Sequence, residues 1–249
     1  LKVDVEHSLY VGDGAGRAAG WAKGRKKDFS CSDRKFAYNV KLPFFTPEEF
    51  FLDQPAVPFE WGGIDPKNIP RGPPVITPPL TGSAFVASPP TFEMILLVGL
   101  PGSGKSHFAT THLVPAGYAW ANRDTLGTKA KCKAAAKAAL AAGTPVVVDN
   151  TNPSPSARAE YIKLAAAAGA PVRVFIFDAT RPEAQHMNEF RAKVTAGERK
   201  AVPGVAYNMY KKHYVEPSLD EGIASIHHVA LSVDFGDDVA REELFNEFT

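Results

Sequence analysis

One glycine-rich segment, GLPGSGKS, has the residue types and spacing needed to bind the phosphates of a nucleotide. Its pattern is G-x-x-x-x-G-K-[ST], and it follows an apolar stretch and precedes a predicted helix, as this motif requires. Its glycines let backbone N–H groups and the helix N-terminus face phosphate oxygens. We expect Lys105 to reach the β- and γ-phosphates of ATP and Ser106 to bind Mg²⁺. The segment comprises Gly99, Leu100, Pro101, Gly102, Ser103, Gly104, Lys105 and Ser106.

Two aspartates follow predicted strands at positions where a kinase needs carboxylates. Asp124 comes just after YAWAN, and Asp149 ends the run PVVVD. Ligands of open α/β sheets bind beyond the carboxyl ends of the strands, so both side chains are expected near the phosphates. Asp124 could accept the proton of a hydroxyl nucleophile, and Asp149 could support Mg²⁺. The alternatives are local: Asp124 or Thr125 could cap the next helix, and Asp149 could be a turn residue in DNTN.

A polar helical segment, TRPEAQHMNEFRAK, follows the fourth apolar strand. An arginine in it, such as Arg191, could stabilise charge on a transferring phosphoryl group. Between Arg191 and Lys212 there are six basic residues and one acidic residue, with Tyr207 and Tyr210 among them. This basic run, 191–212, either tracks a phosphate backbone or forms an ordinary solvated helix face.

The elements that would position these residues can be predicted from the pattern from Glu93 onward. Short β-branched runs alternate with helical stretches, which indicates an α/β fold in which a parallel sheet carries helices on both faces. We therefore expect a P-loop kinase domain over 91–249. The predicted strands are MILLVGL, YAWAN, PVVVD, VRVFIFD and ASIHHVALSV, and the predicted helices are one from Lys105, 128–142, one from Ser154, Arg181 to about Lys200, Val205 to His213, and one from Asp237.

The preceding residues divide into two further parts. Residues 1–52 contain a short strand, a glycine-rich loop and two helical stretches, the second opening with the capping sequence TPEE. Residues 53–90 hold ten of the 21 prolines and are predicted to be a surface linker, because proline breaks ladders and helices. In a free linker the apolar side chains of Phe59, Trp61 and Ile64 would be exposed to water, so we expect them to pack on a flanking domain.

Composition excludes several classes of protein. At 249 residues and 45% hydrophobic content the chain can form an ordinary core, and it is not a disordered, collagen-like or coiled-coil sequence. No apolar run approaches the ~20 residues of a membrane-spanning helix. Cys31 and Cys132 form neither a disulfide framework nor a zinc site, which favours an intracellular protein. With a net charge of +1, affinity for nucleic acid must come from a local basic patch.

Taken together, the motifs of the second half resemble the bifunctional polynucleotide kinase 3′-phosphatase family. GLPGSGKS, NRDTLG, DNTNPSPSAR and FDATRPEAQHMNEFR occur in that family's order and spacing. The resemblance implies that Asp124 is the general base that activates a 5′-hydroxyl end. It also implies that Lys105 and Ser106 bind ATP·Mg²⁺ with the loop amides and that Arg191 acts at the transferring phosphate. Arg158 is a candidate for either a substrate-side or a structural role.

The first 52 residues resemble the closing segment of that family's phosphatase domain, of the haloacid dehalogenase class. The matching stretches are YVGDGAGR and KKDFSCSDRKFAYNVKLPFFTPEEFF. The resemblance makes Asp13 a Mg²⁺ ligand and Asp33 a supporting acid. Such a phosphatase needs an aspartyl nucleophile from a D-x-D-x-[TV] motif, and no D-x-D occurs in the 249 residues. Because the chain also opens at Leu1 in mid-pattern, we expect a piece of a longer protein that cannot remove a 3′-phosphate by itself.

The resulting hypothesis is an ATP-dependent kinase of the 5′-hydroxyl ends of DNA, with RNA left open, that acts in strand-break repair. The family resemblance further implies a nuclear location and partners in a repair complex. We expect a monomer that makes no contact with membranes. Two alternatives stay open: a P-loop kinase of a small metabolite, and a non-catalytic, nucleotide-dependent module that binds DNA ends.

Overall fold

The computed structural model describes residues 4–77, 91–196 and 198–249. The chain forms two compact units. Unit 1 combines Leu1–Ile69 with Phe235–Thr249, and unit 2 is Pro70–Asp234. None of the helices in the described ranges has the length and hydropathy of a transmembrane span.

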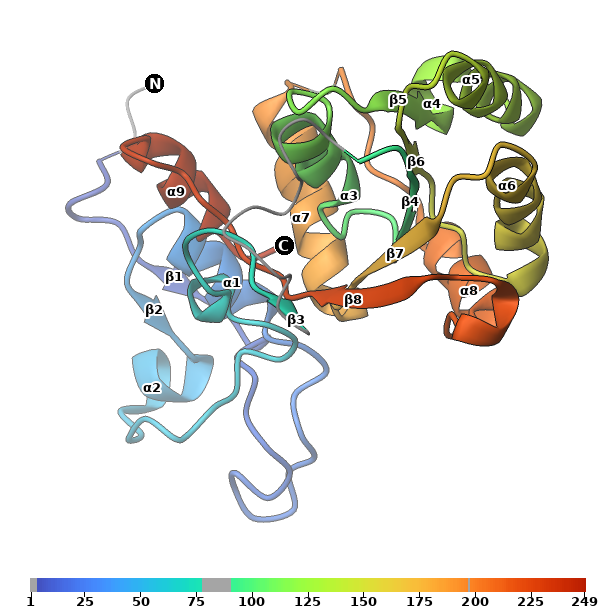
Figure 1. Cartoon of the computed structure of the whole chain (residues 1–249). Coiled ribbons are helices and arrows are strands. Elements are labelled where there is room, and N and C mark those ends of the chain that lie inside the picture. The colour runs from blue at the N-terminus through green and yellow to red at the C-terminus, as the bar shows by residue number, and fades with distance from the viewer. Residues whose placement is uncertain (1–3, 78–90, 197) are drawn as a thin grey trace. The chain divides into compact units, whose positions relative to one another are not determined.

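Unit 2 contains the strands β3 (Ile76–Thr77), β4 (Met94–Val98), β5 (Ala119–Asn122), β6 (Val146–Asp149), β7 (Val172–Phe177) and β8 (Ser225–Val229). They form one six-stranded sheet in the order β3-β8-β7-β4-β6-β5 (Figure 1). All neighbouring strands from β8 to β5 pair in parallel, which confirms the predicted parallel sheet. The carboxyl ends of these strands therefore meet at one edge of the sheet, where open α/β sheets bind their ligands.

The strand β3 comes from the proline-rich segment that the sequence predicts to be a surface linker. It pairs antiparallel with β8 at the edge of the sheet, and Ile76 is buried there. Prolines precede and follow it, and an edge strand tolerates them because some of its N–H groups need no partner. Ile69 is also buried, in unit 1. The described part of the segment thus differs from the prediction at Ile69 and Ile76, which are removed from water, whereas Val75 is exposed as a surface linker would be; 78–90 lie outside the described residues.

The helices of unit 2 are α3 (Lys105–Phe108), α4 (Arg123–Leu126), α5 (Lys129–Ala141), α6 (Pro155–Ala167), α7 (Arg181–Val194) and α8 (Gly204–His213), with the π-helical η2 (Ala109–Leu113) after α3 and the 3₁₀ helix η3 (Leu219–Glu221) before β8. They cover both faces of the sheet, as predicted (Figure 1). In β4, Leu96 and Val98 belong to the core under α5 and α6, whereas Ile95 and Leu97 belong to the core under α3. Since alternate side chains of a strand point to opposite faces, this one apolar strand serves both cores.

Helix α7 ends earlier than the sequence pattern predicts. The prediction extended it to about Lys200, but its last residue is Val194. Ala196 adopts a φ of 48°, in the left-handed region, which terminates regular helix geometry. Arg191 consequently lies in the last turn of α7.

Unit 1 contains β1 (Tyr10–Val11), α1 (Ser32–Asn39), β2 (Phe44–Phe45), α2 (Pro47–Leu52), the 3₁₀ helix η1 (Pro66–Asn68) and α9 (Val239–Phe245). Strands β1 and β2 pair in parallel. The TPEE sequence forms the predicted capping box at the start of α2. Thr46 Oγ1 accepts from the N–H of Glu49 at 3.2 Å, and Glu49 Oε2 accepts from the N–H of Thr46 at 2.6 Å.

An aromatic cluster ties the last residues of the chain to unit 1. The ring of Trp61 stacks on Phe248 with a centroid distance of 4.5 Å and meets Phe59 edge-on at 5.1 Å. Asn39 exchanges two hydrogen bonds of 2.8 Å with the backbone of Phe248. The packing predicted for Phe59 and Trp61 is confirmed. The closing helix, which the prediction placed in the 91–249 domain, instead belongs to unit 1, because this cluster holds its C-terminal end there.

Candidate active site

The glycine-rich loop joins β4 to α3 and requires glycine at two positions for different reasons. Gly104, just before Lys105, adopts a φ of 91°, a left-handed conformation that L side chains rarely adopt. Gly102 has a φ of 81°, and a Cβ built on it would lie only 2.3 Å from the carbonyl oxygen of Ala184. The loop therefore lies against α7, the helix that carries the predicted lid arginine.

Lys105 folds back into this loop. Only 7% of its surface is exposed. Its Nζ donates to the carbonyl oxygens of Gly99 at 3.0 Å and Leu100 at 2.6 Å, and to Ser103 Oγ at 3.2 Å. The ammonium is thus held by neutral acceptors, and anionic phosphate oxygens are stronger acceptors than any of the three.

The charges around Lys105 identify the groups that converge on the loop. Its pKa falls from 10.5 to about 8, chiefly because burial penalises the ammonium. The carboxylates of Asp149 and Asp124 oppose this fall, and the guanidinium of Arg191 adds to it. Charge interactions weaken with distance, so each of these three side chains lies within electrostatic reach of Lys105. The sequence predicted the four residues separately.

Asp149 is the last residue of β6, and 3% of its surface is exposed. Its Oδ2 accepts two hydrogen bonds, from Asn122 Nδ2 at 2.8 Å and from Trp120 Nε1 at 3.1 Å. No hydrogen bond from the residues that the structure describes reaches its Oδ1. The alternative of a turn residue is wrong, because Asp149 is part of a buried parallel strand paired with β4 and β5.

Asp124 lies in the first turn of α4 and is exposed. It does not cap that helix. The N-cap is Asn122, whose Oδ1 accepts from the N–H of Thr125 at 2.9 Å, and the next helix, α5, is capped by Thr128. The helix-cap interpretation of Asp124 and Thr125 is therefore wrong, and the Asp124 carboxylate is open to solvent and to a substrate.

Arg191 lies in α7, and one nitrogen of its guanidinium already donates a hydrogen bond within that helix. Its Nη2 donates to Asn188 Oδ1 at 3.0 Å. Asn188 is itself held by the backbone of Val202, to which its Nδ2 donates at 3.1 Å. The Nε of Arg191 is buried and has no hydrogen-bond partner among the described residues. A buried donor without a partner favours an anionic ligand at this position.

Arg158 proves to be structural. It is fully buried, and its guanidinium makes paired hydrogen bonds of 2.8 and 2.6 Å to the carboxylate of Glu221. It also donates to the carbonyl oxygens of Asn152 at 3.2 Å and Val215 at 3.0 Å. Arg158 thus ties α6 to η3 and to the loop after β6, and its complete burial keeps the guanidinium away from a substrate.

The basic run 191–212 is only partly available to a ligand. Tyr207 is buried, and its hydroxyl donates to the carbonyl oxygen of Ala184 at 3.3 Å, so it packs α8 on α7 and cannot stack on a base. Tyr210 stacks on Tyr214 at a centroid distance of 5.2 Å. The lysines Lys211 and Lys212 are exposed in the last turn of α8. Aromatic stacking along the whole run is therefore ruled out, and the lysine charges remain.

The residues present fit a Mg²⁺ ion held together with a nucleotide. Within the described ranges, no group of three or more His, Cys, Asp or Glu side chains could hold a metal ion without other ligands. Mg²⁺ beside nucleotide phosphates needs no such group, because phosphate oxygens and water supply most of its ligands. The Ser106 hydroxyl at the start of α3 and Asp149 Oδ1, which accepts no hydrogen bond from the described residues, are two oxygen atoms that would complete the set.

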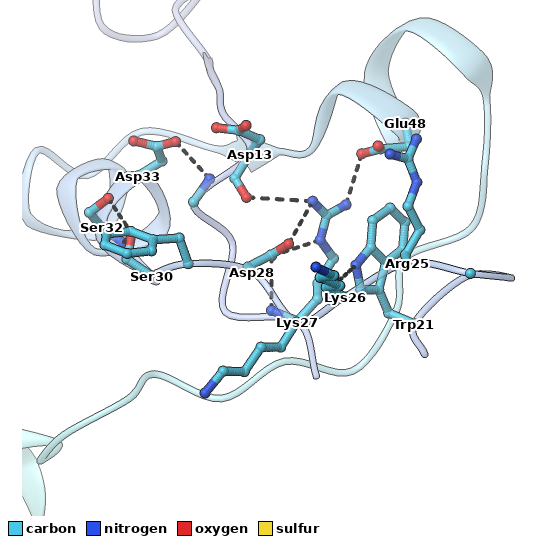
Figure 2. Close-up of a pocket in the computed structure, with 14 residues that line it drawn as sticks. Asp13, Trp21, Arg25, Lys26, Lys27, Asp28, Ser30, Ser32, Asp33 and Glu48 are labelled. Carbon is cyan, nitrogen blue, oxygen red and sulfur yellow. Dashed lines mark hydrogen bonds and ion pairs between the residues drawn. The ribbon is translucent and has the colours of Figure 1, made fainter. Parts of the chain in front are cut away.

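Unit 1 holds a separate cavity of about 630 Å³ around the predicted phosphatase residues (Figure 2). Asp13 is exposed on the loop after β1. Asp33 lies beside it, and its Oδ2 accepts from the N–H of Gly14 at 2.8 Å, which holds that loop on α1. Lys26 and Lys27 also line the cavity. The predicted pair of acids thus shares one cavity with basic side chains.

A buried arginine supports the wall of this cavity. Arg17 forms ion pairs of 2.8 Å with both Asp28 and Glu48, and its guanidinium lies 3.7 Å from the ring centroid of Trp21. These contacts join the loop of residues 17–28, which carries Lys26 and Lys27, to α2. Burial alone would raise the pKa of Asp28, but the hydrogen bonds from Arg17 lower it below its usual value.

The sequence pattern places Asn122 at the end of a strand and Asn188 in the polar helical segment but indicates a role for neither, and it does not single out Trp120. Trp120 and Asn122 are two residues apart in β5, so their side chains lie on the same face, and that spacing was a usable signal. Asn188 and Arg191 are three apart in α7, which places them on one helix face. No pattern within the chain indicated that the first pair would meet Asp149 or that Asn188 would lie beside Gly102.

Two family models match the chain. The family described as "Polynucleotide kinase 3 phosphatase" matches residues 1–51, and the family described as "AAA domain" matches residues 115–217. Among solved structures, Kti12 from Chaetomium thermophilum superposes with a TM-score of 0.43 at 19% identity, over 61% of this chain and 95% of that one.

Relatives that span both units have one description in common. The "Bifunctional polynucleotide phosphatase/kinase" of Schizosaccharomyces pombe is 34% identical over 227 residues, which cover 91% of this chain and 52% of the relative. A relative from Acanthamoeba polyphaga mimivirus, named for the same two activities, is 35% identical over 240 residues, which cover 91% and 56%. The chain spans about half the length of these relatives. With both family matches and both sets of motifs in order, the chain belongs to the bifunctional polynucleotide phosphatase/kinase family.

Proposed function

We propose that unit 2 is an ATP-dependent kinase that phosphorylates the 5′-hydroxyl ends of DNA, with RNA ends as a second class to be tested. The observation that carries this proposal is the convergence of Lys105, Asp124, Asp149 and Arg191 at the carboxyl edge of a parallel sheet. The names of the two relatives support a polynucleotide as the acceptor over a small metabolite.

Each of these residues has its own task in the proposed transfer. Asp124, exposed on α4, takes the proton of the 5′-hydroxyl while that oxygen bonds to the γ-phosphorus of ATP. The bond from the γ-phosphorus to the bridging oxygen breaks, and ADP leaves. Lys105 exchanges its loop carbonyls for phosphate oxygens, and Arg191 donates to the transferring group. Mg²⁺, held by Ser106 and Asp149, would neutralise charge on the phosphates.

For unit 1 we propose the closing part of a 3′-phosphatase site, with Asp13 as a Mg²⁺ ligand and Asp33 holding its loop. The D-x-D nucleophile motif is missing from the 249 residues, so this chain alone is expected to leave 3′-phosphates untouched. A nuclear location and a place in strand-break repair, with partners in a repair complex, are proposed from the family resemblance.

The direct test follows both ends of an oligonucleotide. The chain is incubated with γ-labelled ATP and Mg²⁺ and with oligonucleotides that carry either a 5′-hydroxyl or a 3′-phosphate. Label at the 5′-hydroxyl with the 3′-phosphate intact is the expected result. Label on free nucleosides only would instead indicate a small-metabolite kinase, and ATP binding without any transfer would indicate the non-catalytic module.

The variant Asp124→Asn tests the proposed base. It keeps the shape of the side chain but cannot take the proton, so kcat should fall by roughly 10²–10⁴-fold. Nucleotide affinity should stay the same, because Asp124 lies on the acceptor side. An unchanged kcat would remove Asp124 from the mechanism.

A further inference from the structure

Asn122, the last residue of β5, connects the two carboxylates on which the proposed kinase depends. It is 5% exposed. Its Nδ2 donates to Asp149 Oδ2 at 2.8 Å and to the Asp149 carbonyl oxygen at 3.2 Å. Its Oδ1 accepts from the N–H of Thr125 at 2.9 Å and from Thr125 Oγ1 at 3.0 Å. One buried amide therefore joins the end of β6 to the start of α4, the helix that carries Asp124.

The chemistry of its partners determines how this amide is oriented. A carboxylate and a backbone carbonyl can only accept hydrogen bonds, so the group that faces Asp149 is the NH₂. The backbone N–H of Thr125 can only donate, so the group that faces it is the oxygen. A side chain that both donates on one side and accepts on the other is needed here, and an aspartate of the same size could do only the second.

Trp120 supplies a second donor to the same carboxylate oxygen. Its Nε1 lies 3.1 Å from Asp149 Oδ2, and β5 and β6 pair so that Asn122 is opposite Asp149. Both side chains lie on one face of β5, since they are two residues apart. The two donors meet at Oδ2, so the rotation of the carboxylate is determined and Oδ1 is directed elsewhere.

We propose that Asn122, assisted by Trp120, is a positioning residue of this site. It holds the Asp149 carboxylate in one rotation and sets the first turn of α4 against it, so that one buried side chain sets the spacing between Asp149 and Asp124. The proposal rests on the kinase function proposed above and needs no contact between Asn122 and substrate. It predicts a loss of turnover and not of affinity, because a misplacement of about 1 Å can lower a rate by about 10²-fold.

Four variants separate positioning from general destabilisation. Asn122→Asp and Asn122→Ser can both still cap α4, but the aspartate has no donor for Asp149, and the serine lacks the NH₂ group and is one bond too short to replace it. Each should lower kcat on a 5′-hydroxyl oligonucleotide by roughly ten- to a hundredfold, with KM for ATP changed by less than about threefold. Trp120→Phe leaves the cap intact and should lower kcat by roughly two- to tenfold. Thr128→Ala, the matched control, removes the cap of α5 (3.2 Å to the N–H of Lys131) and should leave kcat unchanged.

A spectroscopic measurement tests the contact without catalysis. The chain has three tryptophans, so three indole N–H peaks are expected in a ¹H–¹⁵N NMR spectrum, and Trp120→Phe identifies the peak of Trp120. If Asn122 sets the rotation of Asp149, both Asn122 variants should move that peak. The peaks of Trp21 and Trp61, which belong to unit 1, should stay in place. Thr128→Ala should move none of the three.

The proposal requires both results. A moved indole peak with unchanged kcat would mean that the contact is only structural. A lowered kcat with an unmoved peak, or a raised KM in place of a lowered kcat, would mean that Asn122 acts on substrate directly; each of these outcomes overturns the proposal. If the Asn122 variants do not fold, the kcat and KM of Trp120→Phe decide. If the unaltered chain labels no oligonucleotide, the proposed function fails. The positioning role of Asn122 is then tested by the indole peak of Trp120 together with the rate of ATP hydrolysis in the same variants.

Discussion

At the scale of single residues, the site holds two donors that phosphate oxygens can satisfy better than their present surroundings do. Lys105 is bound to neutral loop oxygens, and the buried Nε of Arg191 has no partner among the described residues. Burying a charge without an opposite charge is unfavourable, and the lowered pKa of Lys105 expresses this. A nucleotide would supply the missing negative charge, so part of its binding energy comes from relief of this unfavourable burial.

The pH dependence of nucleotide binding follows from the same group. Without nucleotide the pKa of Lys105 is about 8, below its ordinary value of 10.5, and bound phosphates should raise it. Binding therefore takes up a proton as the pH rises through 8, so affinity should change little near pH 7, be about halved at pH 8 and then fall by up to about tenfold per pH unit. The measurement is the Kd of a fluorescent ATP analogue from pH 7 to 9.5. Lys105→Arg, which keeps its charge, should flatten the profile; a flat profile in the unaltered chain would contradict the assignment.

At the scale of elements, the glycine-rich loop and α7 form one assembly. The carbonyl oxygen of Ala184 lies where a Cβ of Gly102 would be, and the hydroxyl of Tyr207 donates to that same oxygen. Loop, α7 and α8 thus share one contact point. A side chain added to the loop would displace the helix that carries Arg191, and the phosphate site would lose part of its wall.

Gly102→Ala tests this close approach against a glycine of similar conformation. Gly143 has a φ of 71°, and a Cβ there would meet no atom within 4 Å, so Gly143→Ala should cost only about 1–2 kcal/mol. Gly102→Ala carries the same conformational penalty plus the clash with Ala184. We expect a larger fall in unfolding free energy and a weaker Kd for ATP, from urea unfolding and nucleotide titration. Equal effects in the two variants would show that the contact with α7 is unimportant.

The buried ion pair between α6 and η3 gives a second prediction about elements. Arg158→Ala leaves the Glu221 carboxylate without its partner and should destabilise unit 2 by about 3–5 kcal/mol. The control is Lys129→Ala, which breaks the exposed pair with Glu160 at 3.0 Å and should cost less than about 1 kcal/mol. Urea unfolding measures both. A stable Arg158→Ala variant with weakened oligonucleotide binding would restore the substrate-side role.

At the scale of the whole molecule, charge gives little general attraction to nucleic acid. The net charge is +1, so binding to a polyanion must use local groups such as Lys211 and Lys212 at the end of α8. Since Tyr207 is buried, any such binding there is electrostatic and should depend strongly on salt.

Charge reversal measures that contribution. If both lysines contact phosphates, Lys211→Glu with Lys212→Glu should reduce the slope of log K against log salt by about 1.4 for a single-stranded end, or about 0.7 per contact. Lys131→Glu with Lys137→Glu on α5 makes the same change in net charge and should leave the slope unaltered. Equal slopes in both double variants would identify the α8 lysines as an ordinary solvated face.

Much of unit 2 and the start of α2 in unit 1 could be predicted because their signals are local. The β-branched runs predicted β4, β6 and β7, and the G-x-x-x-x-G-K-[ST] motif predicted the loop between β4 and α3. The TPEE sequence predicted the cap of α2, because a capping box involves residues only three apart. The predicted end of α7 failed because the pattern does not reveal the left-handed conformation of Ala196, and the linker prediction failed at β3, which pairs with the distant strand β8.

Spacing within a few residues was enough to predict the main strands of unit 2, the phosphate loop, and Asp124, Asp149 and Arg191 as candidates near it. The folded chain was needed to show that Asn122, and not Asp124, caps α4, that Tyr207 is buried, and that Phe248 belongs to unit 1. The difference lies in how far apart in the sequence the interacting residues are. The hydrogen bond between Asn39 and Phe248 joins residues 209 apart, and no local pattern records which distant partner will remove a group from water.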